Sequence, residues 1–287
     1  MANKFFERLA NALLKSGAMA LIDRVFKKEG HDAPQAPPPS SPTPRQKTHP
    51  WRLCPVGEHW VRPHPLRVPK SDKHPDGVTT RDTDCRNNPV RGKKKIAIKD
   101  YLHPHEIHAI AEGRFKDLTG PPAVGKLPYE NSDKYDALIR GWTKYWNEVF
   151  QPKDLLDPDL VKALIGSESG FRLNPPKQNA GIAGKANGLI QLTDQAIKAL
   201  QNPDGELRDR LVKMSSEDAS DPNIAICAGI RWLYHKKAQA SHDLKREATW
   251  LEGIAKYKSY LKDMRSRKKP DPEGMKKIRE DYGKLKQ

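Results

Sequence analysis

The chain has 287 residues, a length that allows about two domains. Its 52 basic and 36 acidic residues leave a net charge of +16, which favours contact with a polyanion such as nucleic acid, anionic lipid or an acidic wall polymer. Only three cysteines are present, so at most one internal bridge can form, which excludes a disulfide-dense scaffold.

Residues 1–30 are expected to form an amphipathic helix. Apolar residues recur there at steps of three or four, opposite several basic residues: Phe6, Ala10, Leu13, Gly17, Leu21 and Val25. Such a helix can dock on a partner protein, on a membrane surface or on the protein's own body, and docking on protein is favoured. Residues 31–50 are rich in proline and are expected to be a stiff, solvated linker.

The N-terminal region lacks the features of an export signal or a membrane span. Its longest uncharged apolar-leaning run covers residues 16–22, whereas a bilayer-spanning helix needs about 20 residues. Ala18, Met19 and Ala20 mimic a signal-peptide cleavage site, but Glu7 and Lys15 interrupt the apolar core that such a peptide needs. We therefore expect a protein made in the cytoplasm without a clear signal peptide and without an integral membrane segment.

Residues 51–128 are expected to form a small irregular α+β region with an accessory or adaptor role. Residues 51–54 and 59–62 suggest short strands, which several prolines interrupt. Pro104 can open a helix that runs to Phe115, and a loop rich in glycine and proline follows at 120–128.

Potential metal ligands lie within this region: Cys54, His59, His64, His74 and Cys85. They could hold zinc, Cys54 and Cys85 could form a disulfide, or the residues could be unlinked and structural. The spacing fits no known zinc pattern, so no metal is expected, and the unlinked interpretation is favoured. Cys227 lies on an apolar helix and is expected to be buried and inert.

From residue 129 the pattern is mainly helical. An apolar stripe begins at Tyr135 and ends at Val149, and further helices are predicted at 158–170, 194–202, 221–239 and 245–265. The residues at 266–287 are expected to be a basic tail that extends a helix or frays. The sequence therefore predicts a mainly α domain at residues 129–265.

The helix at 158–170 carries the most informative carboxylate. Asp157 and Pro158 are typical of a helix start, and Glu168 lies in the last turn, followed by Gly170 and Phe171. A partly buried glutamate has a raised pKa, and a protonated carboxyl group is what glycosidic bond cleavage requires. A glutamate at a helix end is nevertheless more often a solvated or capping residue.

A second segment favours the catalytic interpretation of Glu168 over a solvated or capping role. A glycine-rich turn at 181–184 precedes Asn187 and the run Gly188-Leu189-Ile190-Gln191-Leu192, after which Thr193 or Asp194 can cap a helix.

Together the two segments resemble the soluble lytic transglycosylase (SLT) domain family, which is lysozyme-like. The family pattern has a glutamate-serine-x-phenylalanine helix end, matched by Glu168-Ser169-Gly170-Phe171, and then a glycine-leucine-methionine-glutamine-leucine segment. Further matches follow in order: Asp221-Pro222-Asn223-Ile224 with Gly229 and Leu233, and then Ala255-Lys256-Tyr257. The resemblance covers about residues 130–262.

Three departures from the family pattern stand out. Ile190 replaces the usual methionine, which conserves volume, and Asp194 stands where proline often follows. Lys258, Ser259 and Tyr260 occupy the positions where the family usually has asparagine, alanine and glycine.

The resemblance implies cleavage of peptidoglycan between N-acetylmuramic acid and N-acetylglucosamine. Glu168 would protonate the glycosidic oxygen and then, as a base, activate the muramic 6-hydroxyl to give a 1,6-anhydro product. If water attacks instead, the protein is a muramidase, for which Asp194 or Glu247 could supply a further carboxylate.

The resemblance also implies supporting roles near Glu168. Gln191 would bind sugar, Tyr257 would hold the Glu168 carboxyl, and Ser169 would hold the loop or touch the acetamido group. The alternatives are simple helix-start polarity for Gln191 and a core tyrosine for Tyr257. This chemistry needs no metal and no organic cofactor.

Several biological roles remain open at this stage. The favoured one is an antibacterial effector that a secretion machine delivers to the periplasm or cell wall, with an immunity protein as a further partner. The alternatives are a muralytic factor of phage or conjugation origin and an inactive wall-binding module. A nucleic-acid partner is not expected, because no nucleic-acid-binding motif is present.

Overall fold

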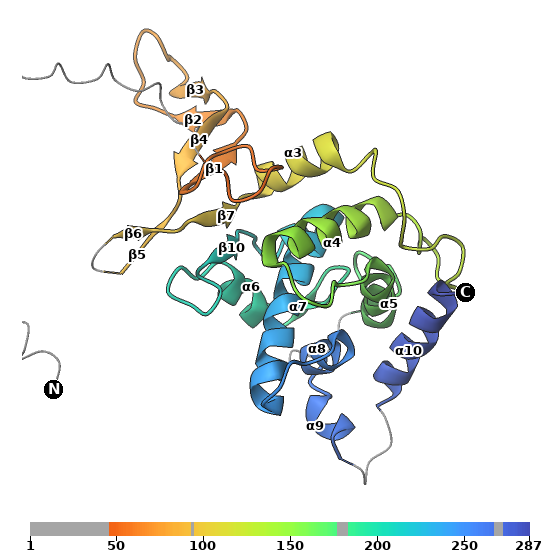
Figure 1. Cartoon of the computed structure of the whole chain (residues 1–287). Coiled ribbons are helices and arrows are strands. Elements are labelled where there is room, and N and C mark those ends of the chain that lie inside the picture. The colour runs from red at the N-terminus through yellow and green to blue at the C-terminus, as the bar shows by residue number, and fades with distance from the viewer. Residues whose placement is uncertain (1–45, 93–94, 177–182, 267–271) are drawn as a thin grey trace, which may run out of the picture. The chain divides into compact units, whose positions relative to one another are not determined.

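The computed structural model describes residues 46–92, 95–176, 183–266 and 272–287. These residues belong to one compact unit, Arg45–Gln287. The helix expected at 1–30 and most of the linker expected at 31–50 lie outside the described residues. In the described part, a small β-rich region precedes a mainly helical body, as the sequence predicts (Figure 1).

Helices α4 (Asp136–Phe150) and α7 (Pro222–Leu244) pack together in the core of the helical body. Two fully buried tryptophans of α4 place their indole N–H groups on α7. Trp142 donates to the side-chain oxygen of Asn223 at 2.6 Å, and Trp146 donates to the carbonyl oxygen of Cys227 at 2.9 Å. Both indoles thus bury their rings without leaving a donor unsatisfied, which stabilises the contact between the helices. Cys227 is buried, as predicted.

The other helices in the described ranges pack around this pair. They are α3 (Pro104–Arg114), α5 (Pro158–Ser169), α6 (Asp194–Leu200), α8 (Trp250–Tyr257), α9 (Leu261–Met264), α10 (Glu273–Leu285) and the short 3-10 helix η1 (Asp218–Ser220). Among them and the central pair, no helix has both the length and the hydropathy of a membrane-spanning segment.

The single helix predicted at 245–265 is wrong, because two separate helices occupy this range. Lys245 ends α7 in a left-handed conformation, with φ of 58°. Thr249 and Glu252 then form a reciprocal capping box that begins α8. After Tyr257 the chain turns through Ser259, which is also left-handed, before α9 begins. Local capping therefore breaks the helix that the apolar periodicity suggested.

Much of the segment expected as a basic tail is helix α10. Its buried residues Met275, Ile278 and Leu285 recur at helical spacing and face α5. Directly after α10, Lys286 pairs with Asp157, the N-cap of α5, and with Asp159 in its first turn. Figure 1 shows the two helices side by side.

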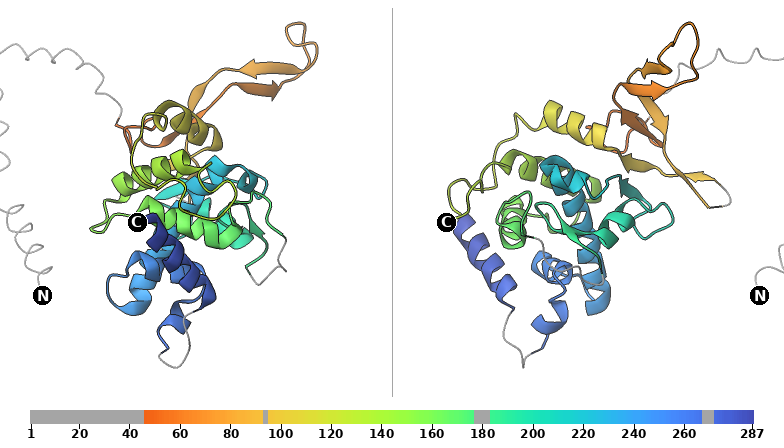
Figure 2. Two further views of the ribbon diagram at one scale, coloured as in Figure 1. Left: turned by 90° about the vertical axis from the view of Figure 1, so that its right-hand side faces the viewer. Right: turned by 180° about the vertical axis from the view of Figure 1, so that it is seen from behind.

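The region before the helical body is built from short strands. Strand β1 (Glu58–Val61) pairs antiparallel with β4 (Asp84–Asn87), and β2 (His64–Arg67) pairs antiparallel with β3 (Val78–Arg81). The four strands follow one another as a single long hairpin that extends from the helices in both views of Figure 2. Strands β5 (Val90–Arg91) and β6 (Ile96–Ala97) form a second hairpin. The parallel pair β7 (Asp100–Leu102) and β10 (Arg210–Val212) joins this region to the helical body.

One of the two strands predicted in this region is absent. Strand β1 confirms the strand predicted at 59–62, but residues 51–54 form turns and bends. The amide of Leu53 donates to the Glu106 carboxylate at 2.9 Å, and the Arg52 guanidinium forms ion pairs with Glu106 and Asp100. Because buried side chains bind this backbone, it makes no strand ladder.

Cys54 and Cys85 form a disulfide, with their Cα atoms 5.7 Å apart. The favoured interpretation, that these cysteines are unlinked, is therefore wrong. The bridge uses both sulfur atoms, so neither thiol is free to ligate zinc. It ties the base of the long hairpin to the turn that precedes β1.

Candidate active site

Local sequence signals place Glu168 at the end of α5. The Asp157 side chain accepts a hydrogen bond from the Asp159 amide at 2.9 Å, with Pro158 in the first turn. At the other end Gly170 takes a left-handed conformation, with φ of 60°. Nearly all of the helix between these caps is buried, so Glu168 ends a rigid element and not a loose loop.

The Glu168 carboxyl group lies in a poorly solvated environment. Its side chain is 13% exposed, and burial raises its pKa above the usual range for a glutamate. The Lys258 ammonium group opposes this shift, because its Nζ lies 2.7 Å from Oε1 of Glu168. A buried carboxyl group with a raised pKa can carry a proton near neutral pH.

A tight turn faces Glu168 across a cavity. Strands β8 (Ala186–Asn187) and β9 (Leu192–Thr193) pair antiparallel, and residues 188–191 connect them. Gly188 has φ of 70°, and a Cβ atom there would clash with the Ala219 carbonyl oxygen, so glycine is required. Gln191 is also left-handed, and its side-chain amide donates to the Gly188 carbonyl at 2.7 Å.

Tyr257, at the end of α8, supports the same turn. Its hydroxyl donates to the Ile190 carbonyl oxygen at 2.6 Å. Burial raises the pKa of this hydroxyl well above its usual value, and the nearby Glu168 charge adds to the shift. Tyr257 therefore stays a neutral donor.

A cavity of about 430 Å³ collects these groups. It is lined by α5, the β8–β9 turn, the end of α8 and the start of α10: Ser167, Glu168, Ala186, Gln191, Thr193, Tyr257, Lys258, Ser259, Tyr260, Glu273, Gly274 and Lys277. The structure thus brings three of the predicted site residues, Glu168, Gln191 and Tyr257, to one cavity. A volume of this size fits a small part of a polymer such as one or two sugar units.

The fourth predicted residue, Ser169, points elsewhere. Its side chain is buried, and its hydroxyl donates to the Ile165 carbonyl one turn earlier at 3.4 Å. This contact agrees with a role in holding the end of α5. Two carboxylates considered for a hydrolytic mechanism also lie outside the cavity lining. Asp194 accepts a hydrogen bond from the Lys185 amide, and Glu247 pairs with Lys237.

Sequence reasoning missed the contribution of Lys258 and of α10 to this cavity. Lys258 was noted as a departure from the family pattern, but nothing local to it indicated that it meets Glu168. For α10, the spacing of Met275, Ile278 and Leu285 was a usable signal of an amphipathic helix. Among the residues that the structure describes, no group of three histidine, cysteine or carboxylate side chains could hold a metal ion.

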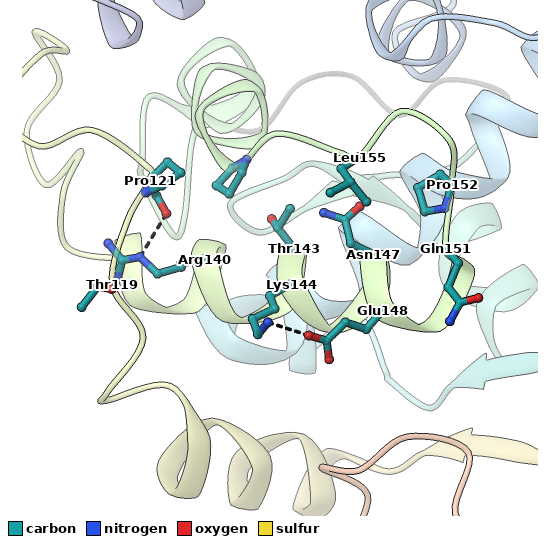
Figure 3. A pocket seen from close by; sticks show the side chains of 11 residues that line it. Thr119, Pro121, Arg140, Thr143, Lys144, Asn147, Glu148, Gln151, Pro152 and Leu155 are labelled. Carbon is teal, nitrogen blue, oxygen red and sulfur yellow. Dashed lines mark hydrogen bonds and ion pairs between the residues drawn. The ribbon is translucent and has the colours of Figure 1, made fainter.

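A larger cavity of about 570 Å³ lies along the outer face of α4 (Figure 3). Its charged groups are already bound within the protein, because Lys144 pairs with Glu148 and Arg140 donates to the Pro121 carbonyl oxygen. Its uncharged lining mixes apolar residues of the proline and leucine type with threonine, asparagine and glutamine side chains. The carboxyl group in this lining, Glu148, is 40% exposed, and, against the effect of burial, hydrogen bonds and charges from Lys144 and His49 lower its pKa, which favours the carboxylate and not the acid. This cavity is therefore a weaker candidate for acid chemistry than the smaller one beside Glu168, where burial raises the pKa of the carboxyl group.

Comparison with known families matches the part of the chain that contains Glu168. Residues 145–272 match the family model described as the transglycosylase SLT domain. The matched range contains α5, the β8–β9 turn, α7 and α8, and it ends directly before α10. No curated protein matches the chain.

Proposed function

We propose that Glu168 is the catalytic acid and base of a lytic transglycosylase. Residues 145–272 match the transglycosylase SLT domain, a type of domain that acts on peptidoglycan. The observation that carries this proposal is the burial of the Glu168 carboxyl group in a cavity that Gln191 and Tyr257 also line. No other residue of α5 presents an ionisable group to that cavity.

In the proposed reaction, protonated Glu168 donates its proton to the oxygen between N-acetylmuramic acid and N-acetylglucosamine. The bond from that oxygen to the anomeric carbon breaks, and the acetamido group of the muramic sugar stabilises the resulting oxocarbenium-like centre. The Glu168 carboxylate then removes the proton of the muramic 6-hydroxyl, whose oxygen bonds to the anomeric carbon. The product is a 1,6-anhydro sugar, and Glu168 recovers its proton.

The surrounding residues support this scheme by position. Gln191 is held at the cavity wall by its own turn through its side-chain N–H, so its side-chain oxygen can accept a hydrogen bond from a sugar hydroxyl. Tyr257 fixes that turn through the Ile190 carbonyl. Ser169 stabilises the helix end that carries Glu168.

A muramidase is the second candidate, and one observation favours it. Glu273 of α10 is a second carboxylate in the cavity lining, and inverting hydrolases use a second carboxylate to activate water. The chemistry of the products separates the two candidates, because only the transglycosylase reaction yields anhydro ends.

The test is the digestion of purified peptidoglycan by the wild-type protein, by Glu168→Gln and by Glu112→Gln, an exposed control on α3. Released muropeptides are identified by mass spectrometry. We expect anhydro-muropeptides from the wild type and the control, and at least a 100-fold lower rate from Glu168→Gln, since general acid–base catalysis contributes about 10²–10⁴-fold.

Other outcomes redirect the proposal. Reducing-end products make the protein a muramidase and make Glu273→Gln the next variant. If no variant releases products but the wild type sediments with the wall, an inactive wall-binding module is the better account.

We also propose that the protein acts in the bacterial periplasm or cell wall as a delivered antibacterial effector, with the region at 51–128 as its adaptor. The Cys54–Cys85 disulfide supports the location, because such bonds persist in oxidising compartments outside the cytoplasm. Expression of the protein in a Gram-negative host with and without an added export signal tests this proposal. Lysis only in the exported case supports it, and equal toxicity in both compartments contradicts it.

A further inference from the structure

Lys258 lies against Glu168 inside the cavity. The Lys258 and Glu168 side chains are only 10% and 13% exposed, and 2.7 Å separates Nζ from Oε1. The SLT family usually has asparagine, a neutral residue, at this position. This chain therefore places a positive charge beside the carboxyl group where the family pattern has none.

The physical effect of that charge has a definite direction. An ammonium group within hydrogen-bond distance stabilises the carboxylate over the protonated acid, and restricted contact with water strengthens the attraction. The proposed acid step requires the opposite form, in which Glu168 is protonated. The ion pair therefore restrains the first step of the proposed reaction.

The other groups that face the cavity do not cancel this effect. Glu273 and Lys277, both on α10, carry opposite charges. The Tyr257 hydroxyl is neutral and donates to the Ile190 carbonyl, and Tyr260 contributes a second phenol. Among the described residues, Lys258 makes the ion pair that reaches Glu168.

We propose that Lys258 is a positioning residue that stabilises the carboxylate form of Glu168 against the opposing effect of burial and so sets the highest pH at which the enzyme cleaves glycan. This inference rests on the proposed function, because it concerns the acid step assigned to Glu168. As the pH falls, Glu168 takes up a proton, the ion pair is lost and the acid form accumulates. Acidification, or a sugar that displaces the Lys258 ammonium group, therefore releases the restraint.

The first measurement is the titration of the Glu168 carboxyl carbon by NMR, with Glu168→Gln used to assign the resonance. Lys258→Met removes the charge, and Lys258→Arg keeps it. The matched control is Lys256→Met, which removes a lysine in the last turn of α8, two residues before Lys258, that pairs with Asp243 on a more exposed surface. We expect Lys258→Met to move the titration of Glu168 upward by roughly one to three pH units, and the other two variants to leave it in place.

The second measurement is kcat/KM for glycan cleavage against pH. The alkaline limb of the Lys258→Met profile should move upward by the same amount, with Lys258→Asn as a second neutral variant if the first does not fold. Unchanged titration and an unchanged limb in a folded neutral variant would overturn the proposal.

Failure of the proposed function and failure of the Lys258 proposal give different results. Full cleavage by Glu168→Gln removes the proposed function, while the NMR titration still reports on the contact between Lys258 and Glu168.

Discussion

The Tyr257 hydroxyl and the Ile190 carbonyl are joined by a hydrogen bond of 2.6 Å across 67 residues of the chain. The bond fixes the turn that carries Gln191 to the helix that carries Tyr257. Because the Tyr257 hydroxyl proton is engaged in this bond, it is not donated to Glu168 or to a sugar. Tyr257 therefore acts on the candidate site mainly by positioning the turn. Ile190 itself is fully buried, which leaves its carbonyl few alternative partners.

Tyr257→Phe should therefore weaken both the fold and the reaction. Loss of the donor leaves the Ile190 carbonyl unsatisfied and should lower the free energy of unfolding by about 1–3 kcal/mol. The loosened turn should also lower the rate of muropeptide release. Urea unfolding and product release are measured in parallel with Tyr282→Phe, which loses a hydroxyl contact to Asp157 outside the cavity. Equal losses of activity in both variants would show that the effect is only one of stability.

His103 should make the protein sensitive to acid. Burial, together with the positive charge of Lys213, lowers the pKa of His103 to about 3. The unfolded chain binds this proton near pH 6.5, and the folded chain does not until about pH 3. Stability is therefore lost as the pH falls through 6.5 toward 3.

The variant that tests this is His103→Asn, because asparagine can still cap α3 as the His103 side chain does. At pH 4 it should be more stable than the wild type by about 1–3 kcal/mol, and at pH 7.5 the two should be similar. Urea unfolding at both pH values measures the difference, with His242→Asn as an exposed control. A gain that is the same at both pH values would contradict the assignment to His103 titration.

Removal of the disulfide should separate stability from activity. The bridge closes a loop with a sequence separation of 31 residues, for which loop-closure entropy predicts about 3–4 kcal/mol. The double variant Cys54→Ser and Cys85→Ser should lose free energy of unfolding on that scale. Its rate of product release at 25 °C should stay close to wild type, because the cavity lining contains no residue before Ser167. A large loss of activity in a protein that is still folded would show that the long hairpin supports the site.

The helix containing Glu168 illustrates what could be predicted from the sequence. The prediction of 158–170 differs from the observed α5 by one residue, because Asp157, Pro158 and Gly170 specify the two ends through contacts within a few residues. The single helix predicted at 245–265 was wrong because local capping signals within that range were given too little weight. Apolar spacing outweighed the capping signal of Thr249 and Glu252, although both residues were visible in the sequence.

The pairing of Cys54 with Cys85 depended on information that the spacing did not contain. The register of β1 on β4 places Trp60 opposite Cys85, and the turn before β1 brings Cys54 to the same place. A different register would have separated the two sulfur atoms, so only the folded hairpin could show that they meet.

The sequence by itself determined the mainly helical fold, the ends of α5 and the order of motifs that leads to the SLT domain. These features depend on interactions between residues close together in the chain and on the order of motifs, both of which can be read from the amino-acid sequence. The tertiary structure alone decided that Lys258 lies on Glu168, 90 residues away, and that α10 forms a wall of the same cavity. Such contacts arise from the packing of distant helices, and no local preference of either residue encodes them.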